Sequence, residues 1–233
     1  MRTLGVIGGM SWESTATYYR LLNQGVARRL GGLHSAALVL HSVDFGPVSA
    51  KLAQADWPGL AQLLAQKGQD LQQAGAQALV LATNTMHKVA DQIEQETGLP
   101  LLHIADATGM ALQAAGVQHA ALLGTRFTME DDAIVRDRLQ QRFGLTVSVP
   151  NADDRGLLHR VIFDELVCGL VQAPSRDAVV ALIERQRLQG AQAVILGCTE
   201  FGLLIDETCS PLPVFDTTVL HAAAAVDWML ETP

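Results

Sequence analysis

The sequence predicts an α/β protein built from two similar lobes, each holding a sheet of mostly parallel strands. Three observations predict this class: short apolar runs of strand length, longer helical patterns between them, and an internal repeat about half a chain apart. Strands that alternate with helices are typical of parallel βαβ units. The length of 233 residues fits either one large domain or two small lobes, and the repeat favours two lobes.

Five apolar runs are bounded by glycine or polar residues and are four or five residues long. They span residues 4–7, 36–40, 78–81, 120–123 and 193–196. Runs of this length and composition predict buried strands.

Two long helices are predicted by apolar residues that recur at helix-face spacing. The first pattern is Tyr18, Leu22, Val26 and Leu30, and the second is Leu60, Leu63, Leu64 and Leu71. Glycines that are expected to end helices stand at Gly98, Gly144 and Gly190.

The repeat is clearest where GAQALVLATNT, residues 75–85, aligns without gaps on GAQAVILGCTE, residues 190–200, at an offset of 115. A weaker echo places LGVIGGM, from Leu4, over AALLGTR, from Ala120. A third echo places Pro100-Leu101 over Pro211-Leu212. We therefore expect a first lobe over residues 1–104, with a C-terminal helix at 216–233 packing back on it, and a second lobe over residues 105–215.

Composition excludes several classes. An apolar content of 49% with 17% charged residues argues against a disordered chain, and a net charge of −8 makes a nucleic-acid partner unexpected. No apolar stretch suggests a membrane helix or a signal peptide. The three cysteines fit neither a disulfide framework nor a zinc site, so a reducing cytoplasm is expected.

Ligands of parallel sheets bind beyond the carboxyl ends of the strands, so the residues after the predicted strands are the candidates. Those of the first lobe are Met10, Ser11, Thr83, Asn84 and Thr85, and those of the second are Thr125, Arg126, Thr128, Cys198, Thr199 and Glu200. This set suits a small carboxylate or an amino acid.

Cys198 follows a strand at a predicted helix N-terminus, a setting that lowers a thiol pKa, whereas Cys168 and Cys209 are expected to be buried and inert. Ser11 fits a helix N-cap, a ligand contact, or both. His87, one turn past Thr83, could orient the site or cap a helix.

The remaining candidates allow more than one interpretation. Gly8-Gly9 lacks a nucleotide-binding pattern, and the seven histidines lack metal-ligand spacing, so neither a nucleotide nor a metal is expected. Asp44 and Glu200 are the acidic residues best placed after predicted strands. Either of them could instead do no more than interact favourably with the dipole of the helix that follows. Arg126 could bind a carboxylate or form a structural ion pair.

The motifs GGMSWEST, TNTMHK from Thr83, GTRFTM from Gly124 and GCTE from Gly197 resemble the aspartate/glutamate racemase family, within the Asp/Glu/hydantoin racemase superfamily. The TNT run is similar to that of its broad or L-selective amino-acid racemases. The resemblance implies two pseudo-symmetric, flavodoxin-like lobes with the active site in the cleft between them. It also implies a homodimer and racemisation without a cofactor, by a pair of residues at the positions of Thr83 and Cys198.

The family commonly has cysteine where this sequence has Thr83, and a threonine hydroxyl is a far weaker acid than a thiol. Cys198 is therefore expected to act as the thiolate base on one enantiomer, which by resemblance is the L form. The donors expected to stabilise the carbanion through the α-carboxylate are Asn84, Thr85, Thr125, Thr128, Thr199 and backbone N–H groups near Met10.

The resemblance implies that the substrate is aspartate, glutamate or a broader set of amino acids. Lys51 could bind the distal carboxylate of such a substrate, or it could be a solvent-exposed helix residue with no part in binding. The acidic pair Asp164-Glu165 would not attract a carboxylate, so neutral amino acids are also open. Two other functions stay open: a decarboxylase or maleate-type isomerase of the same superfamily, and a non-catalytic amino-acid-binding protein.

Overall fold

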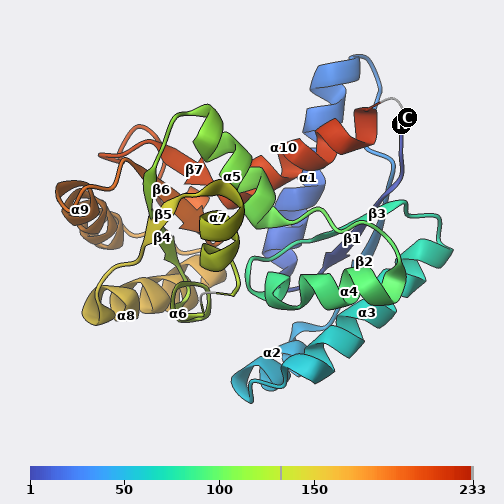
Figure 1. Ribbon diagram of the computed structural model, residues 1–233, viewed down its shortest axis with the longest axis horizontal. Helices are drawn as coiled ribbons and strands as arrows, with labels where there is room; N and C mark the ends of the chain where they lie inside the picture. The colour runs from blue at the N-terminus through green and yellow to red at the C-terminus, as the bar shows by residue number, and fades with distance from the viewer. Residues whose placement is uncertain (132, 232–233) are drawn as a thin grey trace. The chain divides into compact units, whose positions relative to one another are not determined.

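The computed structural model describes residues 1–131 and 133–231, which form two compact units. Unit 1 comprises Met1–His103 and His221–Pro233, and unit 2 comprises Ile104–Leu220. Each unit contains one sheet in which every pairing of neighbouring strands is parallel (Figure 1). The expected α/β class with two parallel sheets is confirmed.

Unit 1 holds the sheet β2-β1-β3, formed by β1 (Leu4–Gly8), β2 (Leu38–Ser42) and β3 (Ala78–Leu81). An isolated parallel bridge between Leu79 and Leu101 lies on the far side of β3. Its helices are α1 (Trp12–Leu30), α2 (Phe45–Ala53), α3 (Trp57–Gln73), the 3-10 helix η1 (Thr85–Val89), α4 (Ala90–Thr97) and the part of α10 (Thr217–Leu230) that starts at His221.

Helices cover both faces of this sheet. Successive residues of β1 and β3 point to opposite faces, so each strand packs against helices on both sides. On one face Leu4 and Val6 pack against α1 and α10, and Val226 of α10 is buried in the same cluster. On the other face Ile7 packs with residues of α3 and α4. Burial on both faces explains why the strands are apolar runs rather than alternating patterns.

Unit 2 holds the sheet β5-β4-β6-β7. Its strands are β4 (His119–Gly124), β5 (Thr146–Ser148), β6 (Ala193–Gly197) and β7 (Val214–Asp216). Its helices are α5 (Ile104–Ala114), α6 (Arg126–Glu130), α7 (Arg136–Phe143), α8 (Ala152–Arg160), the π-helix η2 (Val161–Glu165), α9 (Ala173–Leu188) and the 3-10 helices η3 (Leu166–Cys168) and η4 (Phe201–Leu203).

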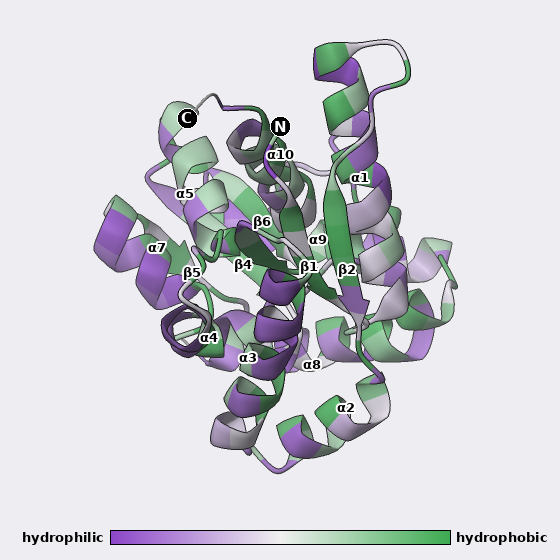
Figure 2. Ribbon diagram, turned by 90° about the vertical axis from the view of Figure 1, so that its right-hand side faces the viewer, coloured by the Kyte–Doolittle hydropathy of each residue, from purple (hydrophilic) through white to green (hydrophobic). Residues whose placement is uncertain are grey.

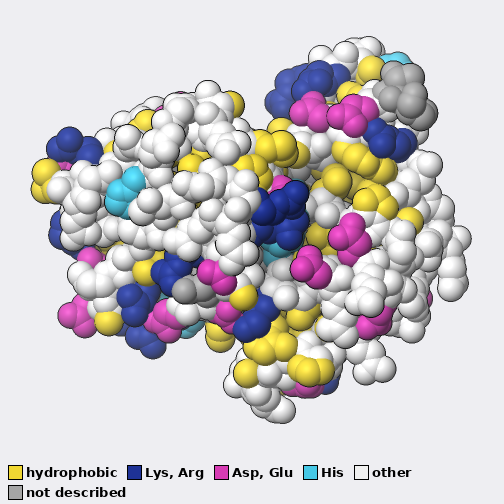
Figure 3. Space-filling model, viewed as in Figure 1, with side chains coloured by type: hydrophobic (Ala, Val, Ile, Leu, Met, Phe, Trp, Pro, Cys, Tyr) yellow, Lys and Arg dark blue, Asp and Glu magenta, His cyan; other side chains and the backbone are white. Residues whose placement is uncertain are grey.

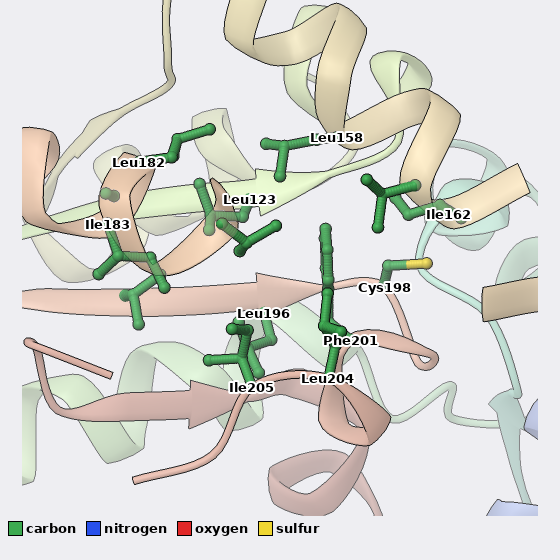
Figure 4. Packing of buried hydrophobic residues seen from close by; sticks show 14 of the residues in the cluster. Leu123, Leu158, Ile162, Leu182, Ile183, Leu196, Cys198, Phe201, Leu204 and Ile205 are labelled. Atoms are coloured by element: carbon green, nitrogen blue, oxygen red, sulfur yellow. The ribbon is translucent and has the colours of Figure 1, made fainter. Parts of the chain in front are cut away.

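The core of unit 2 also lies on both faces of its sheet. Leu123 and Leu196 pack with residues of α8, η2 and α9 on one face, which Figure 4 shows from close by. Leu122 and Ile195 pack with residues of α5 and α7 on the other. In Figure 2 the strand β2 of unit 1 is mostly hydrophobic, whereas the helix α7 of unit 2 is mostly hydrophilic.

Each of the five apolar runs overlaps an observed strand, and both predicted helices form. Gly98 and Gly144 end α4 and α7 in the left-handed conformation, with φ of 66° and 67°. The strands β5 and β7 were not predicted, because three-residue strands are too short for an apolar run to identify them.

The order β2-β1-β3 in unit 1 matches the order β5-β4-β6 in unit 2, and the internal repeat explains the match. Ile7 of β1 pairs with Leu81 of β3, and Leu123 of β4 pairs with Leu196 of β6. These pairs are related by the offsets of the sequence repeat. Thr83 and Cys198 therefore follow equivalent strands, β3 in unit 1 and β6 in unit 2.

Charged side chains of both signs are interspersed on the face drawn in Figure 3, where many Lys and Arg side chains lie beside Asp or Glu. The ion pairs Arg138–Asp106 and Arg142–Asp106, each at 2.6 Å, are examples within unit 2. Among the described residues, no helix combines the length and the apolar character needed to cross a membrane.

Candidate active site

In unit 1 the loop after β1 is held by hydroxyl groups. Ser11 is the N-cap of α1 and accepts a hydrogen bond from the Ser14 N–H at 3.3 Å. Thr15 Oγ1 accepts from the Gly9 N–H at 2.7 Å and donates to the Ser11 carbonyl at 2.9 Å. Gly9 has a φ of 92°, and a Cβ on it would collide with the Val43 carbonyl. The capping role of Ser11 is confirmed, and Met10 beside it is buried in the core.

The segment after β3 presents Thr83, which is half-buried, followed by the buried Asn84 and Thr85. His87, in η1, donates from Nδ1 to the carbonyl oxygens of Thr83 at 2.9 Å and of Asn84 at 3.3 Å. Because Ala82 N–H donates to the Ile7 carbonyl at 3.0 Å, this segment lies at the same edge of the sheet as the end of β1.

In unit 2, Thr125 repeats the capping arrangement after β4. Its Oγ1 accepts from the Thr128 N–H at 3.3 Å. Thr128 is buried, and its side chain lies against Gly124 and Gly197, so its methyl group fills the space where the two paired strands end. Its role as a substrate contact remains a prediction.

Arg126 is exposed, and its guanidinium lies next to Gly156 of α8. It forms no ion pair with any residue in the described ranges 1–131 and 133–231, so the structural ion pair considered from the sequence is not observed. Burial and the charge of Arg126 lower the pKa of His159. Binding of a carboxylate by Arg126 remains a prediction.

The segment after β6 brings a thiol, a hydroxyl and a carboxylate together. Cys198 is buried, and its Sγ lies 3.0 Å from Oε2 of Glu200, which is also buried. Thr199 donates from Oγ1 to the same oxygen at 2.6 Å. In Figure 4, Cys198 lies at the edge of the unit 2 core, past the end of β6, with its sulfur pointing away from the cluster. One carboxylate thus accepts from two neighbouring side chains.

The expectation of a lowered thiol pKa is wrong for this state of Cys198. Burial, followed by the charge of Glu200 and its hydrogen bond, raises the pKa well above the usual value for cysteine. The residues after Cys198 form only the three-residue 3-10 helix η4, so the α-helix N-terminus that was expected to stabilise a thiolate is missing there. The thiol is therefore protonated at neutral pH in this state.

Two other candidates, Lys51 and Asp44, have structural partners, and the two remaining cysteines lie away from Cys198 in the sequence. Lys51 donates to Asp56 at 2.6 Å, and Asp44 caps α2 by accepting from the Gly46 N–H at 3.1 Å. Cys168 is exposed, so the expectation that it is buried is wrong, because it lies in the short turn η3 rather than on a helix face. Cys209 is half-buried and packs at the edge of the unit 2 core.

A buried group of polar rings in unit 1 was missed by the sequence reading. It contains Tyr18, His87, His103 and His221. No local pattern could have found it, because Tyr18 and His221 are 203 positions apart. Within the part of the chain that the structure describes, no group of three or more His, Cys, Asp or Glu side chains is arranged to hold a metal ion.

Comparison with known proteins identifies relatives over almost the whole chain. The Asp/Glu/Hydantoin racemase family matches residues 7–225. A crystal structure assigned as an Asp/Glu racemase from Yersinia pestis is 49% identical, with a TM-score of 0.94, and the match covers 99% of this chain and 100% of that one. An aspartate racemase homologue from Pyrococcus horikoshii is 30% identical, with a TM-score of 0.85 and coverage of 99% and 100%. The broad specificity amino-acid racemase RacX of Bacillus subtilis is 22% identical over 167 residues, which are 69% of this chain and 68% of RacX.

Proposed function

Because this chain belongs to the Asp/Glu/hydantoin racemase family and is an amino-acid racemase, we propose that Cys198 and Thr83 are its catalytic residues. Cys198 removes the α-proton from one face of the substrate, and Thr83 serves the opposite face. The substrates are aspartate, glutamate or a broader set of amino acids, and the reaction proceeds without a cofactor, in a cytoplasmic homodimer. The relatives described as aspartate racemase homologue and as broad specificity racemase support this range.

The observation that carries the proposal is the contact between Cys198 Sγ and Glu200 Oε2, 3.0 Å long and buried. A protonated thiol cannot act as a base, so its proton must leave first. Glu200 is the acceptor at hydrogen-bond distance: the S–H bond breaks, an O–H bond forms on Glu200, and a thiolate remains. Thr199, which donates to the same carboxylate, helps to orient it.

The thiolate then takes the α-proton, so that the Cα–H bond breaks and an S–H bond forms. The electron pair left on the α-carbon delocalises into the α-carboxylate, where hydrogen-bond donors stabilise it. We assign this task to Met10, Ser11, Asn84, Thr85, Thr125, Arg126 and Thr128. Thr199 and Glu200, which are hydrogen-bonded to each other, complete the proposed substrate site.

Inversion is completed when a proton arrives on the other face. Thr83 delivers it from its hydroxyl and recovers a proton from water, and the hydroxide that is left takes the proton held by Glu200, which restores the starting state. A hydroxyl can deliver a proton to a strongly basic carbanion but removes one from a carbon poorly, because a threonine alkoxide hardly forms at neutral pH. No described residue offers Thr83 a basic partner of the kind that Glu200 provides to Cys198. Proton removal should therefore be fast from the enantiomer that presents its α-proton to Cys198, which we propose is the L form, and slow from the other.

The test is α-proton exchange in deuterated water, followed by NMR for a panel of L- and D-amino acids. The Cys198→Ala variant should lose racemisation of both enantiomers, and with it the fast exchange from the enantiomer that presents its α-proton to Cys198. The matched control Cys168→Ala, which removes an exposed thiol of the same unit, should retain it. Equal initial exchange from both enantiomers in the unmodified protein would contradict the single-base assignment.

Two further outcomes would replace the proposal. Turnover of maleate or an arylmalonate without exchange of any amino acid would indicate the other chemistries of the superfamily. Tight binding of an amino acid without exchange would indicate a binding protein.

A further inference from the structure

Four buried side chains from four separate segments meet behind Thr83 in unit 1. They are Tyr18 of α1, His87 of η1, His103 after the bridge at Leu101, and His221 of α10. The ring centroids of His87 and His103 are 4.6 Å apart, and those of His87 and His221 are 5.5 Å apart. Histidine is rarely this buried without a hydrogen-bonded role, so the cluster requires an explanation.

The hydrogen bonds of the cluster define its protons. His221 Nε2 faces the Leu102 carbonyl at 2.7 Å, and a carbonyl only accepts, so this nitrogen carries the hydrogen. His221 Nδ1 is then an acceptor and receives the Tyr18 hydroxyl at 2.8 Å. By the same reasoning, His87 carries its hydrogen on Nδ1, which donates to the Thr83 and Asn84 carbonyls. His87 and His221 therefore each have one defined tautomer and orientation.

The His87 and His221 rings are neutral at physiological pH. Burial lowers the pKa of His87 well below its usual value, and the neighbouring His103 and His221 lower it further. Burial also lowers the pKa of His221 to about 4. His87 and His221 therefore add rigid hydrogen bonding behind Thr83 without adding positive charge.

Unit 2 has a different arrangement at the equivalent positions. The repeat offset of 115 places Gly202 at the position of His87. The strand pairings place Asp216, paired with Leu196, at the position of His103, because Leu101 bridges Leu79 as Val214 pairs with Val194. A Cβ on Gly202 would lie 2.7 Å from Asp216 Oδ2. Carboxylates thus stand near Cys198 where imidazoles stand behind Thr83.

We propose that His87 is a positioning residue for racemisation. Its Nδ1–H, through the carbonyls of Thr83 and Asn84, sets the direction in which the Thr83 hydroxyl and the Asn84 amide face the substrate. His221, held by Tyr18 and Leu102, keeps the His87 ring in place. The inference rests on the proposed catalytic role of Thr83.

The test compares His87→Leu, which removes the donor at similar size, with His87→Asn, whose side-chain amide can replace Nδ1–H. Thr97→Val is the matched control, because Thr97 is also buried in unit 1 and donates to a backbone carbonyl, that of Ile93 at 2.8 Å. Initial α-proton exchange is measured separately from each enantiomer, together with thermal unfolding of each variant.

For His87→Leu we expect exchange from the enantiomer that presents its α-proton to Thr83 to fall about tenfold or more, because small displacements of a catalytic group are costly. Exchange through Cys198 should change by less than about twofold, and His87→Asn should recover most of the loss. A fall of both exchange rates in the same ratio, as a purely structural role would produce and as Thr97→Val should show, would overturn the inference.

Thr83→Val separates this inference from the proposed function. If Thr83→Val changes the ratio of the two exchange rates and His87→Leu does not, the inference fails and the role of Thr83 stands. If His87→Leu changes the ratio and Thr83→Val does not, both the inference and the role of Thr83 fail. If Thr83→Val and His87→Leu change the ratio of the two exchange rates equally, and the double variant changes it no further, the result supports positioning of Thr83 by His87.

Discussion

The buried His221 predicts a specific loss of stability in mild acid. Its imidazole is fully buried between Tyr18, His87 and the Leu102 carbonyl, and this environment lowers its pKa from 6.5 to about 4. The unfolded chain therefore takes up a proton at a higher pH than the folded chain does. The free energy of unfolding must then fall as the pH decreases from about 6.5 to about 4, and this contribution is fully retained above that range.

The size of the effect follows from the two pKa values. At about 1.4 kcal/mol for each pKa unit, the difference between 6.5 and about 4 corresponds to about 3 kcal/mol in total. About 2 kcal/mol of this should be lost by about pH 5. Because a domain is stabilised by only about 5–15 kcal/mol, a loss of this size is large enough to measure. The lowered pKa of His87 acts in the same direction.

The assay is urea unfolding at a series of pH values for the unmodified protein and for His221→Gln. Glutamine can still donate to the Leu102 carbonyl but does not titrate, so the difference between the two stability curves isolates His221. His34→Gln, which removes an exposed histidine of the same unit, is the matched control and should keep the slope of the unmodified protein. Parallel curves for the unmodified protein and His221→Gln between pH 7 and about 4 would refute the reasoning.

Two predictions concern the catalytic pair. Thr83→Cys should accelerate exchange from the slow enantiomer, because a thiol is a much stronger acid than a hydroxyl; an unchanged rate in the deuterium-exchange assay would count against Thr83 as the opposite-face residue. Glu200→Gln should lower the pKa of the Cys198 thiol, since the charge of Glu200 raises it, while slowing exchange from the L-amino acid because the proton acceptor is lost. The pH dependence of Cys198 alkylation measures the first effect, and an unchanged alkylation profile would show that burial alone controls the thiol.

The fold could be read from the sequence because its signals are local. An apolar run such as residues 193–196 identifies β6 without knowledge of its neighbours, and the position of Gly144 identifies the end of α7. The repeat relates Thr83 to Cys198 by counting alone. The short strands β5 and β7 carry no such signal, because they form only through pairing with β4 and β6.

The state of the candidate site depended on contacts that no local pattern encodes. The position of Cys198 after a strand was readable, but its pKa is controlled by burial in the unit 2 core and by the direction of the Glu200 side chain. The sequence predicted a helix N-terminus next to Cys198, whereas the chain forms the short 3-10 helix η4 after it.

By itself, the sequence determined the α/β class, the equivalence of β3 with β6, and the identity of the residues that follow those strands. Only the tertiary structure decided that the Cys198 thiol is protonated against a carboxylate, that Cys168 is exposed, and that His87 is held among Tyr18, His103 and His221. The physical reason is the distance along the chain between the residues that interact. Strand and helix patterns follow from the periodicity of neighbouring residues, whereas burial, charge and hydrogen bonding at a site depend on side chains that the fold brings together from distant parts of the chain.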